Sequence, residues 1–184
     1  KNLMLHPWGL VHGLFDPSTS TRYGPHGCCI LSQEFYETDS SRGFVRGYNL
    51  QITRSAGPVF TARTGLQRGT IPWGAGHHAA MAARYDHTIN IGVCCEDLPE
   101  EHNRVTLDPT LTDSHGIPAP KVSYRLSENS RRMLAHGLAR GTEAMRAAGA
   151  LDVYTEGPVR YSGWHLLGTA RMGTDPERSV VNEW

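Results

Sequence analysis

Hydrophobic and polar residues alternate in two segments of this chain, residues 48–54 and 88–96. Alternation with a period of two is typical of a strand that buries one face and exposes the other. The apolar side holds Tyr48, Leu50, Ile52, Ile89, Ile91, Val93 and Cys95, and the polar side holds Asn49, Gln51, Thr53, Thr88, Asn90, Gly92 and Cys94. We therefore expect an antiparallel sheet with one apolar and one polar face.

Shorter runs predict further strands over residues 9–15, 28–35, 104–107 and 121–126. The last two are separated by the turn-rich stretch DPTLTDSHGIPAP, which predicts a hairpin with a long loop. Between Arg54 and Pro72 the Gly- and Thr-rich sequence shows no clear period. A connection of that length inside a domain is often functional, and we consider it as a candidate lid.

Two helices are expected beside the sheet. Ser127 can cap a helix that runs to about Ala148, with Gly149 past its end, and an Ala-rich helix is expected over residues 77–85. The apolar stripe of the longer helix consists of Leu134, Leu138, Met145 and Ala148. The predicted fold class is α+β, in one domain over residues 1–184. It is a mostly antiparallel sheet of about six strands with helices on one face, the other face being polar and open.

Composition narrows the possible partners. The chain has 184 residues, with 18 Lys and Arg against 18 Asp and Glu, so no net field attracts nucleic acid or an anionic membrane. No apolar run is long enough to span a membrane. The cysteines form the adjacent pairs Cys28-Cys29 and Cys94-Cys95, whose members point to opposite faces of a strand. This favours reduced, mostly buried thiols and a cytoplasmic location over a disulfide between the pairs.

One stretch of the chain matches a glycine motif that is typical of dinucleotide-binding sites. The stretch WGAGHHA matches G-x-G-x-x-A at Gly74, Gly76 and Ala79, and Glu96 follows at about the distance of a ribose-binding acid. A dinucleotide site needs a strand that feeds directly into the first glycine. Here Pro72 and a Gly-rich stretch come before it, which favours a helix packed closely on a sheet.

The remaining motifs exclude several kinds of chemistry. His77 and His78 are adjacent, whereas metal-binding pairs on helices are four residues apart, so no metal site is expected. The chain has no G-x-S-x-G elbow and no P-loop, and Ser162 near His165 does not by itself define a nucleophile and its base. Hydrolase function therefore finds no support, and a dinucleotide-binding role through Gly74 and Gly76 stays the weaker alternative.

His165 is the strongest candidate for chemistry. It ends the strand-like run VRYSGWH, lies between Trp164 and Leu166, and precedes a Gly-Thr turn. A neutral imidazole in such a place can act as a general base near neutral pH. The alternative, which spacing alone favours, is a core histidine that anchors the turn through a hydrogen bond.

Three segments, in order along the chain, resemble the glucose–methanol–choline (GMC) family of flavin-dependent oxidoreductases. HLLGTARMG resembles the family segment H-x-x-G-T-x-R-M-G, KNLMLHP resembles G-R-N-L-x-D-H-P with Leu5 in place of Asp, and NRVTLDPTLTDSHGIPAP resembles its hairpin. The branch closest to KNLMLHP and CILSQEFYETD is similar to sugar and gluconate dehydrogenases. The resemblance identifies the chain as the family's substrate-binding domain, with the flavin lobe outside residues 1–184.

The resemblance also implies a mechanism. His165 corresponds to the family histidine that takes the proton of a sugar, polyol or alcohol hydroxyl, while hydride passes to FAD. The polar sheet face would then be the substrate wall, with Asn49, Gln51, Asn90 and Trp164 as substrate-binding residues. FAD is expected only in the full-length protein, held by the missing flavin lobe, and this chain alone is expected to be inactive. The alternative is a carbohydrate-binding or interaction module without catalysis.

Overall fold

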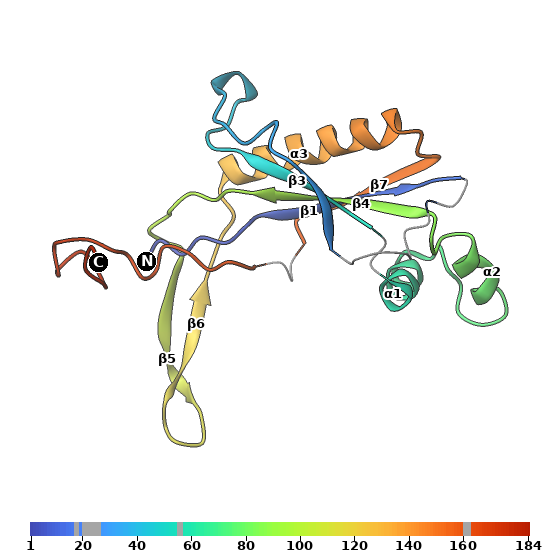
Figure 1. The fold of residues 1–184 in the computed structure, drawn as a ribbon. Helices are drawn as coiled ribbons and strands as arrows, with labels where there is room; N and C mark the ends of the chain where they lie inside the picture. Colours follow the sequence, from blue (N-terminus) through green and yellow to red (C-terminus); the bar gives the residue numbers. More distant parts are fainter. Residues whose placement is uncertain (17–18, 20–26, 55–56, 160–162) are drawn as a thin grey trace.

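The computed structural model describes residues 1–16, 19, 27–54, 57–159 and 163–184 (Figure 1). Five strands form the main sheet in the order β2-β3-β4-β1-β7, and all neighbours are antiparallel. Their bounds are β1 Trp8–Leu14, β2 Cys28–Ser32, β3 Tyr48–Thr53, β4 Thr88–Cys95 and β7 Asp152–Glu156. Strands β5 (Arg104–Thr112) and β6 (Pro118–Ser123) form a separate two-stranded sheet. This confirms the predicted α+β class and the pairing of the two hairpin strands. The long loop is wrong, because β5 and β6 extend into the turn-rich stretch and leave only residues 113–117 between them. The hairpin projects away from the main sheet in Figure 1.

The core lies between the main sheet and helix α3 (Glu128–Ala147). Its largest buried side chains from the sheet are Val11, Tyr48, Leu50, Ile91, Val93 and Cys95, and those from α3 are Met133, Leu134 and Met145. Of these side chains, five are residues that the alternation places on the apolar side of the strands: Tyr48, Leu50, Ile91, Val93 and Cys95. Ser127 caps α3 as expected, because its hydroxyl accepts a hydrogen bond from the amide of Ser130 at 3.1 Å.

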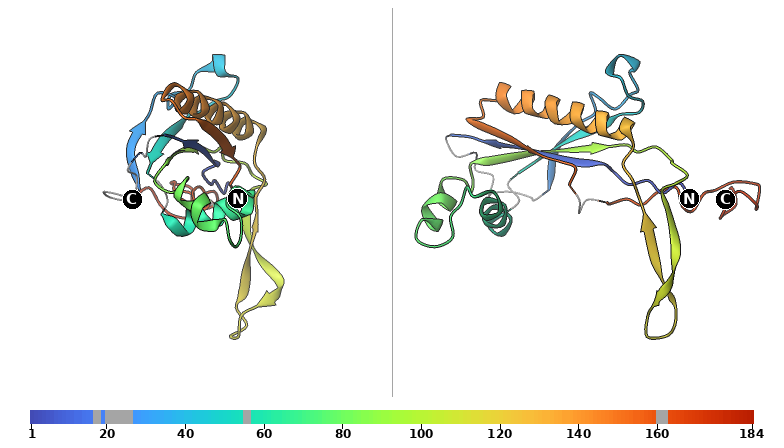
Figure 2. Two further views of the ribbon diagram at one scale, coloured as in Figure 1. Left: turned by 90° about the vertical axis from the view of Figure 1, so that its right-hand side faces the viewer. Right: turned by 180° about the vertical axis from the view of Figure 1, so that it is seen from behind.

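Two glycines allow α3 to approach the sheet closely. A Cβ on Gly137 would lie 2.4 Å from Cγ1 of Val93, and a Cβ on Gly141 would lie 2.9 Å from Cγ2 of Val11. Figure 2 shows α3 lying along one face of the sheet. The predicted stripe is correct at Leu134, Leu138 and Met145, which pack on the sheet. It is wrong at Ala148, which is exposed, and it missed Gly137 and Gly141.

The connection from Arg54 to Pro72 differs from the expectation. Instead of an irregular loop, it contains helix α1 (Pro58–Arg68), while α2 (His77–Ala82) begins where the second helix was predicted and ends three residues earlier. Helix α1 lies on the side of the sheet opposite α3 (Figures 1 and 2). The polar face is therefore covered at the α1 end, whereas all helices were expected on the other face.

Candidate functional site

His165 lies where the two ends of the described chain meet. Residues 163–167 run beside residues 4–6, held by two hydrogen bonds between the backbones of Met4 and Leu167, at 3.0 and 3.1 Å. The His165 side chain is exposed, and its backbone has φ of 55°, in the left-handed region that few non-glycine residues adopt. The run VRYSGWH is not a strand at Val159 or at residues 163–165, and residues 160–162 lie outside the described residues.

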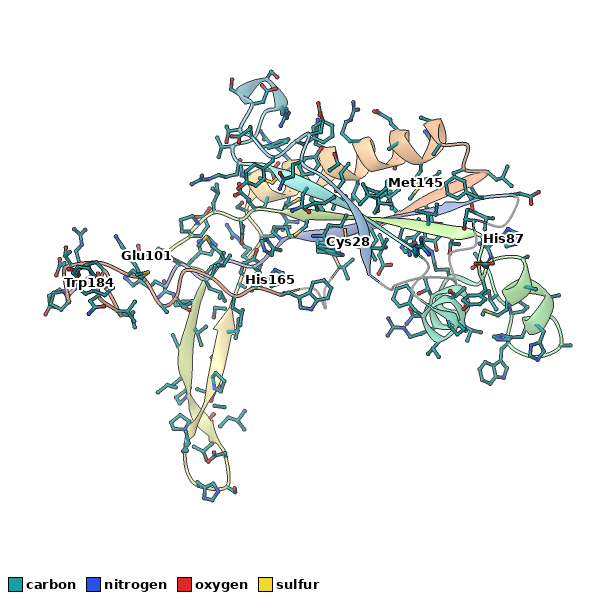
Figure 3. All side chains as sticks on the ribbon, viewed as in Figure 1. Cys28, His87, Glu101, Met145, His165 and Trp184 are labelled. Atoms are coloured by element: carbon teal, nitrogen blue, oxygen red, sulfur yellow. The ribbon has the colours of Figure 1, made fainter. Side chains whose placement is uncertain are left out.

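Two edge-to-face ring contacts hold this segment. The His165 ring lies 5.0 Å from the His6 ring at an interplanar angle of 84°, and the Trp164 ring lies 5.4 Å from the Trp8 ring at 68°. The Trp8 indole covers Gly92, where a Cβ would lie 2.5 Å from its Cζ2 atom. The candidate base is thus fixed at the end of the polar face that α1 does not cover (Figure 3).

The polar face runs from this end toward α1 in successive rows. Asn49 pairs with Cys94, which pairs in turn with Trp8, and the next row contains Gln51 and Gly92. Asn49 and Gln51 are half-buried, and within the described residues the Asn49 side-chain oxygen is covered but has no hydrogen-bond partner. A buried acceptor without a partner costs roughly 1–3 kcal/mol, so this oxygen is a candidate contact for a bound hydroxyl.

Asn90 belongs to a different part of this face. Its side-chain oxygen accepts a hydrogen bond from Nδ1 of His12 at 2.7 Å, and both residues are buried. Tyr154 stacks on His12, and the Arg68 guanidinium of α1 lies 3.5 Å from the centre of the Tyr154 ring. Asn90 lies four positions from Cys94 along β4, a distance of about 13 Å. The structure therefore places Trp164 and Asn49 toward the His165 end, Gln51 in the middle row and Asn90 under α1.

Sequence reasoning missed His6, Trp8 and His12. Trp8 and His12 pair with Cys94 and Asn90 and therefore share the polar face of the sheet. Leu10 lies between them on the same face, so no alternation of polar and apolar residues marked these positions in the sequence. Burial lowers the pKa of His12, although Asn90 and Glu156 oppose that effect. The Nε2 atom of His12 lies 3.8 Å from a Glu156 oxygen, which is too long for a hydrogen bond.

The glycine motif does not form a dinucleotide site. In the described part of the chain, Gly74 and Gly76 follow α1 and a turn rather than a strand, and Glu96 accepts a hydrogen bond from the backbone of Gly47. The named strands pair only in antiparallel fashion, so a parallel unit for the pyrophosphate of FAD is absent from the described residues. The same residues contain no group of three potential metal ligands and no helix that is both long and apolar enough to cross a membrane.

Comparison with known proteins assigns this arrangement to a class. Residues 99–184 match the family model described as GMC oxidoreductase. All of the chain aligns at 39% identity with 2-methyl-1,2-propanediol dehydrogenase of Mycolicibacterium austroafricanum, covering 34% of that protein, and at 28% identity with the gluconate 2-dehydrogenase flavoprotein of Pantoea cypripedii, covering 32%. The fructose dehydrogenase large subunit of Gluconobacter japonicus is 33% identical over 55% of the chain and 18% of its own length.

The chain belongs to the GMC oxidoreductase family. Within that family, the relatives that it matches are dehydrogenases and oxidases. The chain spans about a third of the length of the two relatives that align with all of it.

Proposed function

We propose that this chain is the substrate-binding domain of an FAD-dependent oxidoreductase that oxidises a hydroxyl group of a sugar, polyol or alcohol. The observation that supports this most directly is His165, an exposed imidazole held at the open end of a polar sheet face. The family and the names of its relatives support a CH–OH donor as substrate. A carbohydrate-binding module without catalysis finds no support among these relatives.

His165 would act as the general base. It accepts the hydroxyl proton, so that the O–H bond breaks as an N–H bond forms on the imidazole. When bound, the flavin supplies the acceptor for the hydride that leaves the carbinol carbon. The fixed backbone of His165 and its ring contacts restrict where the imidazole can point, and such orientation supplies much of the rate in a reaction of this kind.

Substrate recognition would fall to the rows nearest His165. The Asn49 oxygen lacks a partner in the described residues and would accept a hydrogen bond from a substrate hydroxyl once the groups that cover it move aside. Trp164 lies beside His165, and Gln51 lies one row further along the face than Asn49. Asn90 is already paired with His12, so we propose that it shapes the far end of the site. The described residues contain no parallel strand–glycine–helix unit for a pyrophosphate, so we propose that residues outside them hold the nucleotide part of FAD.

The test is flavin reduction in the full-length protein purified with its flavin. Anaerobic addition of sugars, polyols and simple alcohols should bleach the flavin absorbance with at least one compound, and His165→Ala should lower the rate by at least about a hundredfold. The matched control is His78→Ala, an exposed histidine of α2. Failure of every hydroxyl compound to bleach the wild-type flavin would contradict the proposed activity, and unchanged reduction in His165→Ala would contradict the role of His165.

A further inference from the structure

The imidazole of His6 is in direct ring contact with that of His165, the candidate base. Met4 and Leu167 form a hydrogen-bonded antiparallel pair, and two residues further along His6 stands opposite His165. Residues that face each other across an antiparallel pair have their side chains in contact. The 5.0 Å, edge-to-face arrangement of the two imidazoles follows from this register.

The His6 ring is itself held in place. Its Nδ1 atom donates a hydrogen bond to the carbonyl oxygen of Cys95 at 2.9 Å, because a carbonyl can only accept. Cys95 is fully buried at the end of β4, so His6 is anchored to a packed part of the sheet. The hydrogen bond also fixes which nitrogen carries the proton, since neutral His6 then has its lone pair on Nε2.

Within the described residues, the side chain of His165 has no comparable hydrogen bond. Its φ of 55° lies in a sparsely populated region, and its side chain is exposed. An exposed imidazole would ordinarily sample several rotamers. The ring contact with His6 is therefore the described interaction that selects one orientation of the His165 side chain.

We propose that His6 is a positioning residue for His165. It links the buried carbonyl of Cys95 to the exposed imidazole, so that His165 meets a substrate hydroxyl in one orientation. The inference rests on the proposed function of His165 as the base. It assigns to His6 no contact with substrate or flavin.

Three substitutions separate the ring contact from the hydrogen bond. His6→Phe keeps an aromatic ring but loses the donor to Cys95, His6→Asn keeps a donor but loses the ring, and His6→Ala loses both. His87→Ala is the matched control, because the Nδ1 atom of His87 also donates to a backbone carbonyl, that of Phe15 at 3.0 Å, but is distant from His165. Melting temperature and flavin content are measured for each variant, so that a general loss of structure is recognised.

In the flavin-loaded full-length protein, His6→Ala should lower kcat by about tenfold or more while KM stays within about twofold, since displaced catalytic groups can cost up to a hundredfold. His6→Phe should recover most of that loss, whereas His6→Asn should not. Recovery by Asn rather than by Phe would overturn the proposal, because a ring beside His165 would then not be needed to orient it. An unchanged kcat in His6→Ala would overturn it as well.

A second measurement needs neither flavin nor turnover. In nuclear magnetic resonance spectra of the 184-residue chain, cross-relaxation should connect the ring protons of His6 and His165, and His165 should occupy one χ1 rotamer. In His6→Ala that rotamer should become averaged. Averaging already in the wild-type chain would overturn the proposal. If none of the hydroxyl compounds reduces the flavin of the wild-type protein, the proposed function fails. The resonance experiment still decides how His165 is positioned in that case.

Discussion

The Nδ1 atom of His12 donates a hydrogen bond to the side-chain oxygen of Asn90 at 2.7 Å, and both side chains are buried between the sheet and α1. Burial lowers the pKa of His12 below 6.5, because the charged ring loses its hydration. Glu156 at 3.8 Å opposes that shift, and Arg68 reinforces it. This pair therefore couples the stability of the polar face to pH.

The stability of the chain should fall as the pH is lowered from about 7 to about 5. When the folded-state pKa lies below the unfolded value, the unfolded chain binds the proton first, so stability is full above 6.5 and is lost as pH falls below it. One proton changes the free energy of unfolding by at most about 1.4 kcal/mol per pH unit. Urea unfolding at several pH values should show that the free energy of unfolding depends less steeply on pH in His12→Gln than in wild type. His136, whose pKa burial also lowers, would contribute the remaining slope, and equal slopes in both proteins would refute the assignment to His12.

Gly137→Ala should destabilise the chain by about 1–3 kcal/mol, although alanine favours a helix. The new Cβ would lie 2.4 Å from Val93 and 3.2 Å from the Tyr48 ring, and both neighbours belong to the packed sheet. Chemical denaturation gives the measurement. The control is Ala139→Gly on the exposed side of α3, which reports helix propensity alone at about 1 kcal/mol. A Gly137→Ala chain that is more stable than wild type would show that α3 does not pack this closely.

Much of the fold was predictable because alternating polar and apolar residues indicate the face of the sheet on which each side chain lies. Strands β3 and β4 were found nearly to the residue, since the side chains that face α3, such as Tyr48 and Val93, alternate in the sequence with those on the other side. Burial itself does not alternate in β4, because Asn90, Gly92 and Cys94 on the other side are buried as well. Strand β7 was missed because it is a five-residue edge strand with charged residues at both ends. Helix α1 was missed because Gly65 and its Thr residues are poor helix formers, and packing stabilises it against the polar face.

The site was less predictable than the sheet. His165 stood out through the family resemblance, and its role stays a prediction. The contacts that fix it, with His6 and through Trp164 with Trp8, join opposite ends of the sequence and depend on the pairing of Met4 with Leu167. A period along one strand carries no information about such a pairing. The same limit hid the bond between Asn90 and His12, which separates Asn90 from the His165 end.

Asp97→Asn should destabilise the chain by about 1–3 kcal/mol, because the carboxylate accepts three hydrogen bonds that an amide cannot all replace. Tyr124 Oη donates to it at 2.6 Å, Ser130 Oγ at 2.8 Å and the Leu5 amide at 3.3 Å. Thermal denaturation provides the measurement. Asp39→Asn, which alters an exposed carboxylate bonded to Ser41, should change stability much less. Equal effects of the two substitutions would show that the Asp97 network contributes little.

Thiol labelling should distinguish the cysteines of the described chain. Cys28 is exposed, whereas Cys94 and Cys95 are buried, and burial raises the pKa of Cys94 to about 11 and that of Cys95 further. In a Cys29→Ser background, native protein should react rapidly with one equivalent of a thiol reagent and denatured protein with three. Rapid labelling of a second thiol in the native state would contradict the burial of β4.

Asn49→Leu should make the chain more stable and the enzyme less able to bind its substrate. The Asn49 oxygen is covered and unpaired in the described residues, and an apolar residue of similar shape removes that cost, roughly 1 kcal/mol. Asn103 is the matched control, because it is fully buried with its amide donating to the Arg125 carbonyl at 3.2 Å and its oxygen accepting from the Arg125 amide at 2.7 Å. Asn103→Leu should therefore lose about 2 kcal/mol or more, since it leaves both backbone groups without partners.

The opposite signs of these two substitutions are what make the comparison informative. A polar group that lowers the stability of the isolated chain persists where it serves binding, so in the flavin-loaded protein Asn49→Leu should raise KM for hydroxyl substrates by about tenfold. Urea unfolding of the chain and steady-state kinetics of the full-length protein give the two numbers. If Asn49→Leu destabilises the chain as Asn103→Leu does, the Asn49 oxygen has a partner within the chain, and its proposed contact with substrate would lose its physical basis.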